Sequence, residues 1–420
     1  MSGAFFAPDL YLNTDSCGSI LVTIGVIMTK KNTNDFTDDL ISALNKEHGS
    51  KIAYNLAHDT SPTHVNRWIS TGSRLLDYII ANRNDGGLPE GRIVEIFGPP
   101  SIGKSHIAIQ IARSTQQMGG IVVYIDTENA TSVENLALLG VDITKRFVYV
   151  DTHCTEEVLS IAESTIMKAK AMDKNVPITI VWDSVAASSP KAELVGDYDK
   201  ESIGLQARAI SKGMRKITGV IANQNVLFIC LNQIRTKVGV MYGDPTTTPG
   251  GKAIPFHSSV RIKLGAGQQI QDKNKNVIGI HVSAKTIKNK VSAPFRDCKF
   301  EIHFGIGIKE HEQIFDVLRK HGKELIDGKE VCIAGSGTWK SLMVTDAKTG
   351  EVLVEKKFYK TEFDQILKDP EYSAYTDALL ERAMVKKMSN PNEINIDPES
   401  YEEVRAVALD LEEDLILPEE

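Results

Sequence analysis

The stretch Gly98-Pro99-Pro100-Ser101-Ile102-Gly103-Lys104-Ser105 decides the fold that we expect for this chain. It fits the pattern G-x-x-x-x-G-K-[ST] of a phosphate-binding loop. An apolar run at residues 93–97 precedes it and a helix beginning near His106 follows it, as the motif requires. In such a loop the glycines turn backbone N–H groups toward phosphates, Lys104 reaches the β- and γ-phosphates, and Ser105 coordinates Mg²⁺. The motif therefore predicts that these eight residues bind ATP and Mg²⁺.

The sequence around this loop predicts an α/β fold. Five apolar runs are predicted strands, at residues 93–97, 121–125, 147–150, 178–182 and 226–231. Their apolar residues are continuous rather than alternating, which is typical of parallel strands covered on both faces. Later runs at 260–264, 277–287 and 298–304 favour antiparallel strands. We expect a central, mostly parallel sheet, an N-terminal helix and a small α+β C-terminal lobe.

Three polar side chains follow predicted strands, at the edge of the sheet where the loop lies. Asp183 ends one strand, and a carboxylate in that place can hold Mg²⁺ through water. Glu128 could orient the water that attacks the γ-phosphate, or it could be a solvated loop acid, and its position alone does not decide. Gln233 could bind the γ-phosphate and report hydrolysis to the loop that follows, or it could only cap that loop.

Two segments have the composition of nucleic-acid-binding loops. The first, at 193–204, is followed by Arg208, Lys212, Arg215 and Lys216, which share one face of a helix. Such a face can track phosphates, although a solvated basic face is an equally common explanation. The second, at 235–251, reads RTKVGVMYGDPTTTPGG. Its glycines and threonines offer donors to a phosphate backbone, and its apolar residues could wedge between bases.

Charge and composition are compatible with a DNA-binding protein that has an acidic tail. The net charge is −7, and residues 391–420 contribute eleven acids and one base, a balance of −10, so the rest of the chain carries +3. No apolar run approaches the roughly 18 residues of a membrane span. The five cysteines lack metal-ligand spacing, and we interpret them as isolated thiols of a reducing compartment. We therefore expect a cytoplasmic protein without a membrane partner.

The chain divides into five predicted regions. Residues 1–33 form an extension, and Met28 begins a polar stretch typical of a protein start. Residues 34–66 contain an amphipathic helix that packs either on its own core or on a neighbouring molecule. Residues 67–306 form the ATPase core, 307–390 the small lobe and 391–420 the acidic tail.

Five stretches, in this order, resemble signature sequences of the bacterial RecA family. They are ISTGS at 69–73, GLPEGRIVEI at 87–96, DSVAA at 183–187, LNQIR at 231–235 and KNKVSAPF at 288–295. The resemblance covers residues 36 to about 345 and continues more weakly to about 388. It implies a RecA-type ATPase core with two DNA-binding loops, and an N-terminal helix that packs on the adjacent protomer.

The resemblance also implies roles for individual residues. Glu128 would be the catalytic carboxylate, Gln233 the γ-phosphate sensor, and Phe256 part of the connection between ATP and DNA. Lys288 and Lys290 would reach across the protomer interface to the neighbour's ATP. The residues implied in contacts with the DNA backbone are Arg208, Arg215, Arg235, Gly250 and Gly251, and the wedges between base triplets are Ile203 and Val238.

The implied activity is that of a DNA-dependent ATPase that forms filaments on single-stranded DNA and catalyses homologous pairing and strand exchange in recombinational repair. Implied partners are single-stranded and duplex DNA, further copies of the chain in a helical filament, and single-strand-binding or mediator proteins. Some positions depart from the family: Ser132 and Asn135 replace its adenine-binding acid and stacking tyrosine, Pro249 replaces a threonine, and Pro255 an interface lysine. These departures, with the unusual stretch at 330–357, suggest a phage-encoded or otherwise distant member of the family.

Two other functions fit parts of the sequence. A hexameric helicase or clock-type ATPase would share the phosphate loop and Asp183, but would not be expected to carry both DNA loops and the KNK stretch at 288–290. A DNA-coating protein that uses ATP only as an assembly switch would not require Glu128. ATP turnover with and without single-stranded DNA distinguishes this second alternative from a recombinase.

Overall fold

The computed structural model describes residues 36–57, 59, 61, 63–196, 204–236 and 246–386. Two compact units, Met1–His64 and Val65–Glu420, are described separately. The predicted extension at 1–33, the acidic tail at 391–420 and the two predicted wedges, Ile203 and Val238, lie outside the described residues.

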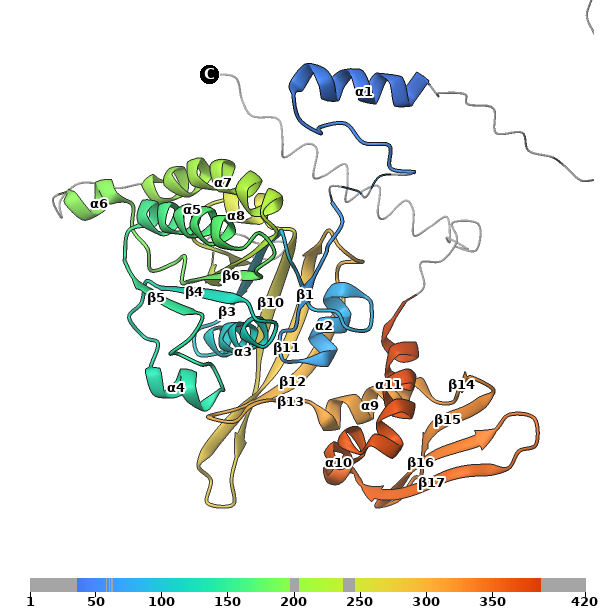
Figure 1. The fold of residues 1–420 in the computed structure, drawn as a ribbon. Helices are drawn as coiled ribbons and strands as arrows, with labels where there is room; N and C mark the ends of the chain where they lie inside the picture. The colour runs from blue at the N-terminus through green and yellow to red at the C-terminus, as the bar shows by residue number, and fades with distance from the viewer. Residues whose placement is uncertain are drawn as a thin grey trace, which may run out of the picture. The chain divides into compact units, whose positions relative to one another are not determined.

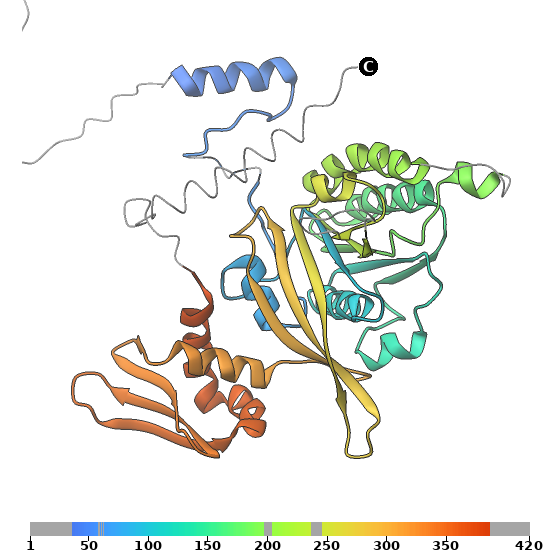
Figure 2. The ribbon, with the colours of Figure 1, turned by 180° about the vertical axis from the view of Figure 1, so that it is seen from behind.

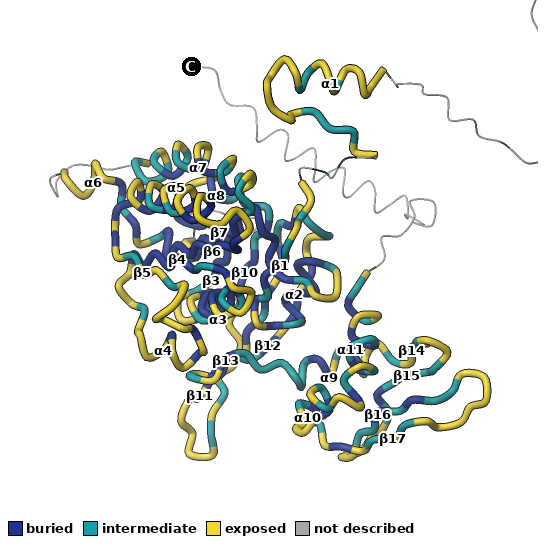
Figure 3. The backbone as a smooth tube through the Cα atoms, viewed as in Figure 1, coloured by how far each residue is buried: buried dark blue, intermediate teal, exposed yellow. Residues whose placement is uncertain are grey.

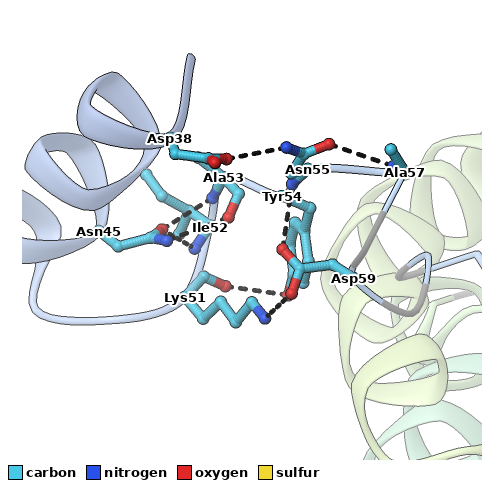
Figure 4. Close-up of polar contacts among 9 residues, drawn as sticks. All are labelled: Asp38, Asn45, Lys51, Ile52, Ala53, Tyr54, Asn55, Ala57 and Asp59. Atoms are coloured by element: carbon cyan, nitrogen blue, oxygen red, sulfur yellow. Dashed lines mark hydrogen bonds and ion pairs between the residues drawn. The ribbon is translucent and has the colours of Figure 1, made fainter. Parts of the chain in front are cut away.

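The N-terminal unit contains the predicted amphipathic helix, α1 (Phe36–His48), followed by an irregular segment. Asn45 holds that segment against the helix, because its Oδ1 accepts hydrogen bonds from the backbone N–H groups of Ile52 and Ala53, each at 2.8 Å (Figure 4). Figure 3 draws most of α1 in the colour of exposed residues. No residue of α1 is buried, and Phe36 and Leu40 are exposed. Among the described residues of this unit, therefore, none covers the apolar side chains of Phe36 and Leu40.

The second unit is built on a nine-stranded sheet (Figure 1). Its strands lie in the order β13 (Gly307–Lys309), β12 (Asp297–His303), β11 (Val277–Asn289), β10 (Val260–Gln271), β3 (Ile93–Gly98), β7 (Val226–Gln233), β6 (Ile178–Asp183), β4 (Ile121–Asp126) and β5 (Phe147–Asp151). The strands from β10 to β5 are parallel, and β10 to β13 pair antiparallel. This arrangement confirms the predicted α/β fold.

Helices cover both faces of the parallel part of the sheet (Figures 1 and 2). One apolar core joins the sheet to α2 (Arg74–Ala81), α3 (Lys104–Gln117) and α4 (Val133–Leu138), and a second joins it to α5 (Thr155–Met172), α7 (Leu205–Asn223) and α8 (Ala253–His257). Burial on both faces explains why the strands read as continuous apolar runs. The short pair β1 (Trp68–Ile69) and β2 (Leu88–Pro89) lies outside the main sheet.

Several boundaries differ from those predicted. Helix α3 begins at Lys104 rather than near His106, because Gly103 at φ 93° turns the chain directly into the helix. The predicted first loop contains part of α6 (Lys191–Val195). The predicted second loop is not wholly irregular, since β8 (Arg235–Thr236) pairs with β9 (Thr246–Thr247).

The small lobe places three helices and a short 3₁₀ turn against one antiparallel sheet. The sheet contains β14 (Glu324–Ile326), β15 (Lys329–Ala334), β16 (Trp339–Asp346) and β17 (Val352–Tyr359), and the helical segments are α9 (His311–His321), the turn η1 (Lys360–Glu362), α10 (Phe363–Lys368) and α11 (Pro370–Met384). The last helix begins at Pro370, because Asp369 caps it and proline is favourable at its first position.

Buried polar side chains attach this lobe to the core. Glu310, just before α9, accepts a hydrogen bond from the backbone N–H of Arg74 at 2.5 Å, at the start of α2. Arg296 is buried and its guanidinium donates to the carbonyls of Tyr78 and Met384. These contacts join segments far apart in sequence and fix where the lobe begins.

Candidate functional site

The phosphate-binding loop lies between the end of β3 and the start of α3, as predicted. The ammonium group of Lys104 is buried there and donates hydrogen bonds to the carbonyl oxygens of Gly98 at 3.2 Å and Pro99 at 2.8 Å. Burial lowers the pKa of Lys104, while the nearby carboxylates of Asp183 and Glu128 act in the opposite direction. An anion that entered the loop would stabilise the charged ammonium, and the free N–H groups of the first turn of α3 would favour the same ligand.

One cavity of about 360 Å³ brings together the five side chains predicted for the nucleotide site. Its lining contains Lys104, Ser105, Glu128, Asp183 and Gln233. The loop residues Pro100, Ser101 and Gly103 complete its wall, while Ile102 is buried. The sequence reasoning missed His106, which also lines the cavity and whose pKa is lowered to about 4 by burial. The sequence offered one indication that His106 lies in this site, namely its position directly after Ser105.

Asp183 is held at the end of β6 by a buried tyrosine. Tyr124 Oη, on the neighbouring strand β4, donates a hydrogen bond to Asp183 Oδ2 at 2.6 Å. Burial raises the pKa of Asp183, and hydrogen bonds from Tyr124 and Ser105 oppose that rise. Carboxylate and hydroxyl oxygens are the ligands that Mg²⁺ prefers, so the pair Ser105 and Asp183 fits this ion. Tyr124 was not singled out from the sequence because a tyrosine in a buried strand usually only packs.

Glu128 is positioned by side chains at the carboxyl ends of β6 and β7. The Ser184 hydroxyl donates to Glu128 Oε1, and Gln233 Nε2 donates to the same oxygen at 3.3 Å. Asp126, at the end of β4, shapes the loop by accepting the backbone N–H of Glu128 at 2.9 Å and that of Thr131 at 2.9 Å. Burial raises the pKa of Asp126, but these hydrogen bonds outweigh it and the net pKa is lowered. Asp126 therefore stays charged and fixes the turn that carries Glu128.

The end of β7 connects the cavity to the second predicted DNA loop. Asn232, beside Gln233, donates through Nδ2 to Glu95 Oε1 at 3.0 Å and to the carbonyl of Pro249 at 3.1 Å. Asn232 was not predicted as a site residue, although it directly precedes Gln233. Asn232 thus links the strand end beside Gln233 to the chain at Pro249.

The described residues that were predicted to contact DNA come from α7, from β8 and from the turn that follows β9. Gly250 and Gly251 have φ values of 89° and 70°, and a Cβ at Gly251 would lie 3.0 Å from Ala207 Cβ. Arg208 and Arg215 lie on α7, and Arg235 is at the exposed start of β8. Gly250 and Gly251, at the end of the second predicted loop, therefore lie beside the helix that carries Arg208 and Arg215.

The two lysines predicted to cross a protomer interface do not line the cavity. Lys288 lies on β11 and donates to the carbonyl oxygens of Pro255 at 2.6 Å and Phe256 at 3.0 Å, at the end of α8. Burial lowers the pKa of Lys288, and the nearby charges of Lys290 and Arg261 lower it further. Phe256 itself is 68% exposed. Lys288 is thus bound to α8, which begins directly after the second predicted DNA loop.

Ser132 and Asn135 have a local role in this chain. Ser132 caps α4, because its hydroxyl accepts the backbone N–H of Asn135 at 3.0 Å. Neither residue offers the charge or the aromatic face that the RecA resemblance implied at these positions.

Comparison with known proteins identifies the family. A family model described as the RecA N-terminal domain matches residues 36–309. The chain belongs to the RecA family. It is 43% identical to protein RecA of Ruminococcus albus over 248 residues, which are 59% of this chain and 60% of that protein. It is 38% identical to protein RecA of Chlorobaculum tepidum over 312 residues, which are 73% of this chain and 87% of that protein. It is 40% identical to protein RecA of Wolbachia pipientis over 285 residues, which are 68% of this chain and 77% of that protein.

Family membership confirms the predicted activity. The chain is an ATP-dependent DNA recombinase and a DNA-dependent ATPase, and it shares the ATP binding, DNA binding and filament formation of the RecA family. Among the described helices, none is long and apolar enough to cross a membrane.

Proposed function

We propose that the cavity beside the phosphate loop hydrolyses ATP, with Glu128 as the residue that orients and deprotonates the attacking water. Its carboxylate lies in the same cavity as Lys104, so a γ-phosphate held by the ammonium group would place the reacting atom near Glu128. Gln233 Nε2 donates a hydrogen bond to Glu128 Oε1. A γ-phosphate would compete for that amide, and Gln233 would then report the nucleotide state through Asn232 to the DNA loop.

We propose that Ser105 and Asp183 hold Mg²⁺ during this reaction. The ion would neutralise charge on the β- and γ-phosphate oxygens. Tyr124 keeps Asp183 Oδ2 oriented through its hydrogen bond from the neighbouring strand β4. Lys104 and the N–H groups of the first turn of α3 bind and orient the phosphates.

We propose that DNA lies across the start of α7. Arg208, Arg215 and Arg235 would contact its backbone together with the N–H groups of Gly250 and Gly251, and Ile203 and Val238 would separate base triplets. In the filament, the apolar face of α1 would pack on an adjacent protomer, where Lys288 and Lys290 would approach that protomer's ATP. A cytoplasmic location and single-strand-binding or mediator partners complete the proposal.

The observation that carries this proposal is the convergence of Lys104, Ser105, Glu128, Asp183 and Gln233 on one cavity. Strand exchange between a circular single strand and a linear duplex, measured together with ATP turnover, tests it. Turnover should require single-stranded DNA. Lys104→Ala should abolish ATP binding in isothermal titration, because Lys104 is the only lysine or arginine among the described residues that line the cavity. His106 also lines it, but burial lowers its pKa to about 4, so it is neutral at pH 7. Unchanged ATP affinity in Lys104→Ala would refute the site, and DNA binding without turnover would favour a DNA-coating protein.

A further inference from the structure

A second cavity lies away from the nucleotide site, on the far half of α3. It has a volume of about 520 Å³, and its walls come from α3, from β1, from the turn before β2 and from β13. A smaller cavity of about 210 Å³ shares Ser70, Asp85 and Gly86 with it, so the two form one groove. Volumes of this size are typical of sites for organic ligands. None of the residues proposed for ATP or DNA lines either cavity.

The floor of this groove contains an unsatisfied amide. Gln110 is only 6% exposed, yet among the described residues its side-chain amide has no hydrogen-bond partner. A Cβ at Gly72 would lie 3.4 Å from Gln110 Oε1, and a Cβ at Gly307 would lie 3.0 Å from Gln110 Nε2. The amide therefore lies between two glycines and next to open volume. The amide can therefore donate and accept hydrogen bonds with a ligand that enters the groove.

The rim of the groove carries two charges of opposite sign. Arg113 and Asp85 are both exposed, both line the larger cavity, and neither has an ion-pair partner among the described residues. The indole nitrogen of Trp68, which also lines the cavity, is buried without a hydrogen-bond partner in the described part of the chain. Ile306 adds an exposed apolar wall.

We propose that this groove binds an extended peptide segment of a partner protein, with Gln110 pairing to a backbone amide. An amide side chain can donate to a peptide carbonyl and accept from a peptide N–H at once, which matches a backbone better than it matches a simple anion. Arg113 pairs with an acidic side chain of the segment, and Asp85 with a basic one. The continuation into the smaller cavity suits an extended chain rather than a compact molecule.

The test uses the full chain labelled with 5-fluorotryptophan. The sequence contains three tryptophans, Trp68, Trp182 and Trp339, and Trp68→Phe assigns the resonance of the groove. The probes are three blocked tetrapeptides of sequence EAAK, KAAE and QAAQ, since the direction of the segment is not fixed by the charges alone. Binding is measured by fluorine NMR titration.

One of the two charged peptides should shift the Trp68 resonance saturably, and the uncharged peptide should bind about tenfold more weakly. Gln110→Leu and Arg113→Met should each weaken binding by about tenfold, whereas Arg319→Met, an exposed arginine on α9, should leave it unchanged. Because Arg113 is exposed, its variant remains informative if the buried substitution at Gln110 impairs folding. A Trp68 resonance that no peptide moves, or equal losses in Arg113→Met and Arg319→Met, would overturn the proposal.

Discussion

Gln233 Nε2 donates a hydrogen bond to Glu128 Oε1 at 3.3 Å, although the two residues are 105 positions apart in the sequence. Gln233 ends β7 and Glu128 follows β4, so the contact depends on β6 lying between these strands with all three carboxyl ends at one edge. The contact joins the residue proposed to activate water to the residue proposed to sense phosphate. It implies that the two side chains respond together when nucleotide binds.

We expect Glu128→Gln to retain ATP binding while slowing hydrolysis by about 100-fold, because an amide cannot accept the proton of water. Single-turnover hydrolysis and isothermal titration with ATP measure the two effects. Ser184→Ala is a matched control that removes the hydroxyl donor to Glu128 but leaves the carboxylate, and it should reduce turnover much less. Turnover near the wild-type value in Glu128→Gln would mean that another group activates the water.

Tyr124→Phe removes the 2.6 Å hydrogen bond to Asp183 without changing the shape of the buried ring. This bond lowers the pKa of Asp183 against the effect of burial, so its loss should raise that pKa further. The concentration of Mg²⁺ that supports half-maximal turnover should rise by about tenfold. A Mg²⁺ dependence equal to that of the wild type would show that Asp183 is oriented without Tyr124.

Lys288→Met and Lys290→Met should differ in their effects. Both remove a charge that we place near the ATP of an adjacent protomer, so both should weaken ATP-triggered assembly, measured by light scattering, and DNA-stimulated turnover. Only Lys288 holds the carbonyls of Pro255 and Phe256, so Lys288→Met should also speed hydrogen exchange in α8. The double variant should remain folded. Normal DNA-stimulated turnover in the double variant would reject the interface role.

The buried Asp77 predicts a specific dependence of stability on pH. Burial raises its pKa to about 7, although Ser70 and Thr71 donate hydrogen bonds to it. Between the unfolded pKa and about pH 7 the folded chain holds a proton that the unfolded chain releases, so the free energy of unfolding falls as pH rises through this range. Each pH unit in the range is worth about 1.4 kcal/mol.

Asp77→Asn keeps the hydrogen-bonding geometry but cannot titrate. Between about pH 5.5 and about pH 7, the wild type should lose about 2 kcal/mol relative to this variant, measured by urea denaturation. The pKa of Glu310 is also raised by desolvation, but Glu310 is present in both proteins, so the effect of its titration on the comparison largely cancels. Parallel pH profiles for the two proteins would show that Asp77 is ionised throughout.

The sequence by itself determined the sheet, the phosphate loop and the family. These depend on local signals, because a buried parallel strand needs a continuous apolar run and a phosphate loop needs its glycines, lysine and serine within eight residues. The strand ends at Asp183 and Gln233 were likewise visible, since each polar residue directly follows an apolar run.

Only the tertiary structure decided which distant residues meet. The strand order β3-β7-β6-β4 brings Gln233 to Glu128 and Tyr124 to Asp183, and a linear sequence does not state that order. Two further features depend on tertiary structure in the same way: Lys288 binds α8, and several segments form the groove around Gln110. In both cases the residues that meet are far apart in the sequence. The physical reason is that apolar periodicity fixes which residues a strand or helix buries, whereas pairing and packing between elements fix the partners of the polar groups left at their ends.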